Sequence, residues 1–231
     1  MTTQLTKYFG ILTVAGALTA SCSTFSAFAG VLPPQSSAYG KTLAQWSELY
    51  SRWAFGDVTV ATDANGNPVV NNVILWPTPL LLIQSSGQSD VTINSGQAFV
   101  FPIYGWLGTS YLDGTPDDTF LSLNDFKNNA LTVKIDGATV INDCNKMQFF
   151  TEFHFNPPIP LPQPDFYPFN AVIYEQSIGF VHTPLTPGKH KITVDASIYL
   201  PDSNPVFGPV DWHYSWNVTV LCQRDVETKC K

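Results

Sequence analysis

A strict alternation of apolar and polar residues near the C-terminus limits the fold of this chain more than any other feature. In residues 211–220, the apolar positions are Trp212, Tyr214, Trp216, Val218 and Val220. Successive side chains of a strand point to opposite faces, so this run predicts a strand with one buried and one solvated face. Residues 191–199 repeat the pattern. Together they predict an antiparallel sheet that is wet on one side.

Further short strands are predicted along the chain, separated by turn dipeptides such as Asn65-Gly66 and Asp136-Gly137. Segments with strand character lie at residues 91–93, 98–104, 131–141, 147–155 and 174–182. Roughly eight to ten strands with turns at this spacing predict a mainly β fold, an antiparallel β-sandwich or a jelly-roll-like arrangement. The proline-rich arm at residues 156–170 is expected to be a stiff extended crossover.

Residues 39–55 are the one long segment with a helical period. Thr42 and Gln45 have the spacing of a capping box at the start of a helix. The aromatic and aliphatic side chains Trp46, Leu49, Tyr50 and Trp53 then recur at helical spacing. We expect this stripe to pack on a sheet and to cover the strand at residues 98–104, which is apolar on both faces. A second short helix, capped by Ser122, is expected at residues 122–130.

The first 29 residues have the features of a secretory signal peptide. Lys7 gives a positive start, residues 9–20 are apolar, and Ala27 and Ala29 supply small residues before a cut at Gly30. A rival cut before Cys22 would produce a lipoprotein. The domain is therefore expected to span residues 30–231 and to be secreted or periplasmic, without a transmembrane segment.

The charge balance excludes several classes of partner. The whole chain has 11 basic and 18 acidic residues, and the leader contains one of the basic residues, Lys7, and none of the acidic ones. Without the leader, 10 basic and 18 acidic residues remain, which is a net charge of −8. Nucleic acids and anionic membrane surfaces are bound through clustered positive charge, so neither is expected as a partner.

Three cysteines remain after a cut at Ala29, and an exported location favours disulfides. Cys222 and Cys230 flank a short polar tail, and this local pair is preferred. Pairing of Cys144 with Cys222 is the alternative, which would tie two strands together.

The motifs YGKTLAQWSELYSRWAF, VTINSGQAFVFPIYGW, VKIDGATV and SIGFVHTPLTPGKHKITV together resemble a family of exported bacterial β-sandwich proteins with a tryptophan-rich N-terminal helix and no assigned activity. The resemblance covers roughly residues 39–220. It implies the fold and the compartment, and it implies no catalytic residues.

Aromatic residues near predicted strand ends are the candidates for ligand binding. Rings presented from the edge of a sandwich can stack on sugar rings or contact a protein. The candidates are Trp76, Tyr104, Trp106 and Tyr111, and Trp106 with Tyr111 form the favoured pair.

The run LDGTPDDTF gathers Asp113, Asp117 and Asp118 on one loop. Calcium binds several carboxylate and carbonyl oxygens, so this loop is a weak candidate for a calcium site. A solvated polar turn explains the same residues.

Two carboxylate–histidine pairs could in principle form a general base. Glu152 and His154 share one face of a predicted strand, and Asp211 neighbours His213. Neither pair has an identified nucleophile. A metal site built from the four histidines, which include His182 and His190, has no supporting spacing.

Taken together, these features predict an exported, non-catalytic β-sandwich protein that binds a ligand or partner, possible ligands including carbohydrate, at the cell envelope or outside the cell. A secreted hydrolase acting on glycans and an envelope structural protein are the alternatives. No cofactor is expected apart from the weak calcium candidate.

Overall fold

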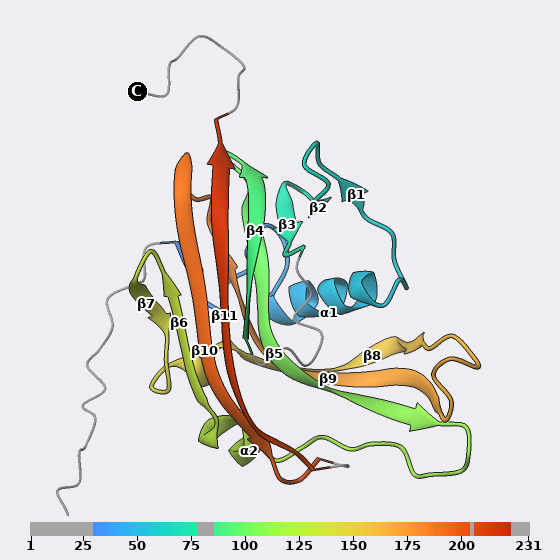
Figure 1. Ribbon diagram of the computed structural model, residues 1–231. Coiled ribbons are helices and arrows are strands. Elements are labelled where there is room, and N and C mark those ends of the chain that lie inside the picture. Colours follow the sequence, from blue (N-terminus) through green and yellow to red (C-terminus); the bar gives the residue numbers. More distant parts are fainter. Residues whose placement is uncertain (1–29, 78–85, 204–205, 223–231) are drawn as a thin grey trace, which may run out of the picture.

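Two β-sheets pack face to face in the computed structural model, which describes residues 30–77, 86–203 and 206–222, and this confirms the predicted sandwich (Figure 1). Sheet A has the order β1-β2-β3-β5-β9-β8, and sheet C has the order β4-β11-β10-β6-β7. The strands of sheet A are β1 (Ala61–Thr62), β2 (Pro68–Val70), β3 (Val73–Leu75), β5 (Ala98–Tyr111), β8 (Phe150–Pro160) and β9 (Phe169–His182). Those of sheet C are β4 (Ser86–Asn94), β6 (Ala130–Ile135), β7 (Ala138–Ile141), β10 (Gly188–Leu200) and β11 (Phe207–Leu221).

A group of aromatic rings lies in the core between the sheets, among a larger number of aliphatic side chains. Trp76 lies 4.9 Å from both Phe99 and Phe101 of β5 between ring centroids, and Trp216 of β11 lies 4.9 Å from Phe101. Trp216 and Val218 are buried while Asn217 between them is partly exposed, so the alternation predicted for β11 is confirmed. Burial of these aromatic and aliphatic side chains is the main source of stability for the sandwich.

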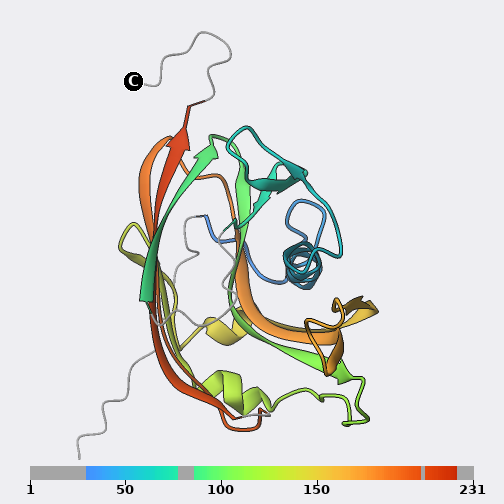
Figure 2. The same ribbon diagram turned by 45° about the vertical axis from the view of Figure 1, so that its right-hand side comes forward.

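Helix α1 (Leu43–Ala54) covers the outer face of sheet A, against β5, β8 and β9 (Figure 2). Its capping box is formed as predicted. The backbone N–H of Gln45 donates to the Thr42 hydroxyl, and the backbone N–H of Thr42 donates to the side-chain oxygen of Gln45. The buried stripe is rotated relative to the prediction. Trp46 and Tyr50 are buried with Ser47 and Ser51, whereas Leu49 and Trp53 are only partly buried.

Helix α2 (Leu123–Asn128) confirms the second predicted helix, with Ser122 as its N-cap. The expected hairpin at residues 131–141 is also present as β6 and β7. The region 147–155 begins with a short 3₁₀ helix, η1 (Lys146–Phe149), and continues as β8. Within the described residues no helix is both long and apolar enough to cross a membrane.

The two strands predicted at residues 91–93 and 98–104 are present and lie in different sheets, and β4 runs parallel to β11. One expectation about a connection needs correction. The proline-rich arm at residues 156–170 forms the end of β8 and the turn into the neighbouring antiparallel strand β9, so it crosses over no other strand.

The far halves of β5, β8 and β9 bend away from sheet C and project beyond it, at the lower right of Figure 1. Register shifts accompany the bend, including one between Gly108 and Thr109. A Cβ atom at Gly108 would lie 1.9 Å from the ring of Tyr174, so only glycine allows β9 to approach this closely. A second small core of Phe155, Ile159, Leu161 and Val172 stabilises this projection.

The register excludes a disulfide between Cys144 and Cys222. The Leu131 N–H donates to Asp143, next to Cys144, and Leu131 is level with Ala196 and hence with Trp212 of β11. Cys222 follows Trp212 by ten positions, or about 30 Å along a strand, whereas bonded cysteines need Cα atoms within about 7 Å. Neither described cysteine is a free thiol. Cys230 lies outside the described residues, so the pairing of Cys222 with Cys230 stays a prediction.

Candidate ligand-binding tip

Two of the four aromatic residues predicted to bind a ligand belong to the interior. Trp76 is completely buried in the core, so the prediction that its ring meets a ligand is wrong. The ring of Tyr104 stacks on Phe126 at 6.0 Å between centroids, and burial raises the pKa of Tyr104 to about 12. Both rings pack against other aromatic side chains of the protein, Trp76 against Phe99 and Phe101 and Tyr104 against Phe126.

Trp106 and Tyr111 both lie close to Tyr174 on the projecting half of sheet A. They lie on either side of Gly108, which pairs with Tyr174 of β9. Burial raises the pKa of Tyr174 to about 12, and the charges of Asp118 and Tyr111 raise it further. Both candidates are partly buried. The predicted pair lies on one strand, β5, where Trp106 packs against the main core and Tyr111 is at the end of the strand.

The loop after β5 is fastened to the strand by Asp118. One carboxylate oxygen accepts the Thr109 N–H at 2.8 Å and the Thr109 hydroxyl at 2.9 Å, and the other accepts the Tyr111 hydroxyl at 3.0 Å. The Tyr174 hydroxyl also donates to the Thr119 carbonyl at 2.5 Å. These contacts hold residues 112–121 against the sheet and fix the orientation of Tyr111.

Beyond Tyr111, exposed apolar side chains gather where the loop after β5 meets the turn between β8 and β9. They are Leu112, Phe166, Tyr167 and Phe169, whose exposed fractions are 50%, 42%, 64% and 39%. Phe169 lies 5.5 Å from Tyr111 between ring centroids. We call residues 111–118 and 161–169 the tip. A concentration of exposed rings on a soluble domain marks an interaction site.

The tip is rigid, because its backbone groups are bonded across the two loops. The Leu112 N–H donates to the Pro168 carbonyl at 2.9 Å, which joins the loop to the turn. Within the turn, the Phe169 N–H donates to Phe166 and the Gln163 side chain donates to Phe169, at 2.7 Å and 2.6 Å. A ligand therefore meets preformed rings and little ordering is needed on binding.

The electrostatic environment of the tip is negative. Residues 105–121 and 155–175 contain no lysine or arginine, whereas Asp113, Asp117, Asp118 and Asp165 lie in the tip loops. Arg52 of α1 reaches the base of the projection, where it donates to the Pro157 carbonyl at 2.8 Å. Its charge is already paired with Glu48 and Asp57, at 3.0 Å and 2.6 Å.

The three acids proposed as calcium ligands are not brought together. Asp118 is engaged by Thr109 and Tyr111, while Asp113 accepts the Thr115 N–H at 3.0 Å, a bond that lowers its pKa. Asp117 is exposed. Among the described residues, no group of three or more acidic, histidine or cysteine side chains is arranged to hold a metal ion.

The predicted acid–histidine pairs take other partners. His154 lies against the ring of Phe120 at 4.7 Å, and Glu152 accepts from the Gln176 amide at 2.9 Å. His213 is hydrogen-bonded to Asp195, directly across on β10, and not to Asp211 as the sequence had implied. These are contacts on exposed faces of the sheets.

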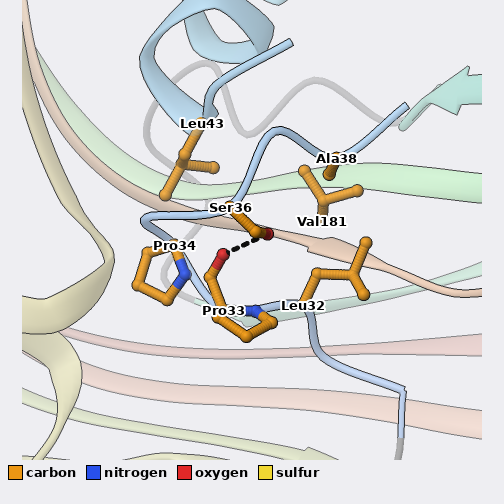
Figure 3. A pocket seen from close by; sticks show the side chains of 7 residues that line it. All are labelled: Leu32, Pro33, Pro34, Ser36, Ala38, Leu43 and Val181. Atoms are coloured by element: carbon orange, nitrogen blue, oxygen red, sulfur yellow. Dashed lines mark hydrogen bonds between the residues drawn. The ribbon is translucent and has the colours of Figure 1, made fainter. Parts of the chain in front are cut away.

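The N-terminal segment borders a small apolar hollow with a volume of about 10 Å³ (Figure 3). It lies between the start of α1 and β9, and its lining residues include Leu32, Pro34, Leu43 and Val181. Ligand pockets of ordinary size hold about 300–1,000 Å³. The hollow is a packing imperfection beside the segment that pairs with the end of β9 through Leu32 and Val181.

Sequence reasoning missed a buried polar cluster beneath α1. Glu175 of β9 accepts hydrogen bonds from the hydroxyls of Ser51 and Ser177, both at 2.5 Å. Burial raises the pKa of Glu175 to about 7, and the nearby charge of Glu48 raises it further, against the two hydroxyl donors. The buried hydroxyl of Tyr50 has no hydrogen-bond partner. The only available signal was the pair of serines at i and i+4 on the apolar side of the helix.

No known protein family matches this chain, and no curated protein sequence is similar to it at a significant level.

Proposed function

We propose that this chain is an exported, non-catalytic binding protein whose tip holds an extracellular carbohydrate. The observation that carries the proposal is the group of exposed rings at the end of sheet A, in particular Phe166, Tyr167 and Phe169. Aromatic rings offer flat apolar faces to the C–H surfaces of sugars, and neighbouring carboxylates accept hydrogen bonds from sugar hydroxyls.

The arrangement of the acids supports binding over hydrolysis. A glycoside hydrolase places two carboxyl groups across a cleft, one of them free to donate a proton. At the tip, Asp118 is engaged by Thr109 and Tyr111, and Asp113 is fully exposed with a lowered pKa. The lowered pKa of Asp113 keeps its carboxylate an ionised acceptor, which suits recognition of hydroxyl or ammonium groups.

The export signal supports the location of this binding. The leader has the features of a secretory signal peptide, and a cut after Ala29 leaves a chain of net charge −8. The low content of charged residues and the many aromatic rings suit a protein that acts outside the cytoplasm. We propose secretion or a periplasmic location on these grounds.

A glycan-array screen of the protein without its leader tests the proposal. Tyr167→Ala removes the most exposed ring of the tip, and Tyr199→Ala is the matched control because Tyr199 is 47% exposed on the distant β10. We expect Tyr167→Ala to weaken every glycan signal at least about fivefold, as loss of a central contact does. Equal signals from the two variants, or no glycan bound by the unaltered protein, would contradict the proposal.

A further inference from the structure

The charge of the tip narrows the class of ligand beyond a carbohydrate in general. We propose that the tip selects a polysaccharide made of amino sugars with free ammonium groups and rejects anionic glycans. This inference rests on the function proposed above, because it concerns the same site.

The first support is that exposed acids and exposed apolar side chains are neighbours in the sequence of both tip loops. Asp165 precedes Phe166, and Asp113 follows Leu112, so each loop of the tip carries a carboxylate beside an exposed apolar side chain. An ammonium group is attracted both by a carboxylate and by the face of an aromatic ring. A glucosamine unit carries such a group on a flat ring, and it can use both kinds of contact at once.

The second support is the availability of these carboxylates. No ion pair involves Asp113, Asp117 or Asp165 within the described residues. The nearest arginine at the projection, Arg52, is bonded to two acids of its own. Phosphate, sulfate and uronate groups would therefore approach several negative charges with no cation to receive them.

A basic peptide would satisfy the same charges, but the edge of the sheet does not suit it. Extended peptides gain much of their affinity from backbone bonds to an exposed strand. At the projection the two edge strands of sheet A are β8 and the far half of β5. In β8, Pro157, Pro158 and Pro160 have no N–H to donate, and in β5 the N–H and the carbonyl of Thr109 are already bonded to Asp118. Rings and carboxylates beside edges that are obstructed in this way favour a sugar.

Two oligosaccharides built on the same sugar ring test the proposal by calorimetric titration of the whole mature chain at pH 5. At this pH a glucosamine hexamer carries ammonium groups, whereas an N-acetylglucosamine hexamer has the same groups capped as neutral amides. We expect the glucosamine hexamer to bind about tenfold more tightly at low salt, since two exposed charge pairs contribute about threefold each. The preference should shrink at high salt, because exposed charges are screened.

Two variants locate the effect. The double variant Asp113→Asn with Asp165→Asn should reduce the preference to about twofold or less, because it removes both carboxylate charges and keeps the oxygen acceptors. Tyr167→Ala should weaken both hexamers. Both acids are exposed, so these changes leave the folded core intact, and thermal melting checks this.

The outcomes separate this inference from the proposed function. Equal affinity for the two hexamers, still lost in Tyr167→Ala, overturns the charge preference and leaves carbohydrate binding in place. Tighter binding of polygalacturonate, or displacement of the glucosamine hexamer by an equal concentration of lysine hexamer, also overturns it. No binding of any sugar overturns both.

Discussion

Replacement of Glu175 by glutamine should change the pH dependence of stability more than any other single substitution. Glu175 of β9 is buried beneath α1, and its carboxyl group accepts hydrogen bonds from the hydroxyls of Ser51 and Ser177. The titratable groups that face it from the helix are Glu48 and Tyr50, and neither supplies a positive charge. Burial therefore favours the protonated form in the folded protein.

The magnitude follows from the pKa of Glu175, which rises from 4.5 to about 7 on folding. Below pH 4.5 the group is protonated in both states, and its favourable contribution is complete. Between pH 4.5 and 7 the unfolded chain loses the proton while the folded protein keeps it. Stability then falls by about 1.4 kcal/mol per pH unit, or about 3 kcal/mol in total, and levels off above pH 7.

Urea unfolding followed by tryptophan fluorescence measures this effect at pH 5, 6, 7 and 8. Glu175→Gln keeps the shape and removes the charge, so it should be close to the unaltered protein at pH 5 and up to about 3 kcal/mol more stable at pH 8. His182, whose pKa burial lowers, and His190, whose pKa is raised mainly by its bond to Asp136, titrate in both proteins and cancel in the difference.

A matched control is Glu152→Gln, on the neighbouring strand β8, because Glu152 is exposed. It should reproduce the pH dependence of the unaltered protein. A constant difference in stability between Glu175→Gln and the unaltered protein from pH 5 to 8 would refute the reasoning, and would mean that water reaches Glu175.

Four further substitutions test how α1 and the projection are stabilised, each by chemical denaturation. Trp46→Ala should destabilise the protein by about 3–5 kcal/mol because its ring is completely buried, and Trp53→Ala by clearly less because its ring is partly exposed. Equal losses would show that Trp53 is buried as well. Thr42→Ala removes the capping box of α1 and should reduce stability by about 1 kcal/mol, with Thr42→Ser as the control that retains the hydroxyl. Gly108→Ala should destabilise by more than about 1 kcal/mol because the new methyl group meets the ring of Tyr174, and unchanged stability would show that β9 can move away.

Local patterns were sufficient for much of the fold. The alternation in β11, the hairpin of β6 and β7, and the capping box of α1 each depend on residues close in sequence, and each is present. The sheet to which a strand belongs depends on distant partners. For this reason the parallel pairing of β4 with β11 could not be read from the sequence, because nothing near residues 86–94 specifies residues 213–221.

The face that α1 buries shows the same limit. Hydrophobic spacing favoured Trp53 over Ser51, but Ser51 is buried because Glu175, 124 positions away, accepts its hydroxyl. A serine does not indicate from the local sequence pattern whether its side of a helix is buried or exposed. The burial of Ser51 is explained by the position of its partner carboxyl group.

The candidate site was half predicted. Tyr111 was identified because it ends an apolar strand beside acids, but Phe166, Tyr167 and Phe169 were overlooked inside the proline-rich arm. The available signal was a cluster of large apolar residues in a stretch that lacks the alternation of a buried strand. Trp76 was predicted to lie near the end of a strand, where its ring could meet a ligand, because Pro77 follows it. The chain still runs through the core at this point, and the ring is buried.

Mapping the bound sugar by nuclear magnetic resonance tests the central claim most directly. Titration of the isotope-labelled mature chain with the glucosamine hexamer should shift backbone signals of residues 109–118 and 163–170 and leave the outer face of sheet C unchanged. Shifts centred on β10 and β11, or no shifts at millimolar sugar, would contradict the assignment of the tip as the binding site.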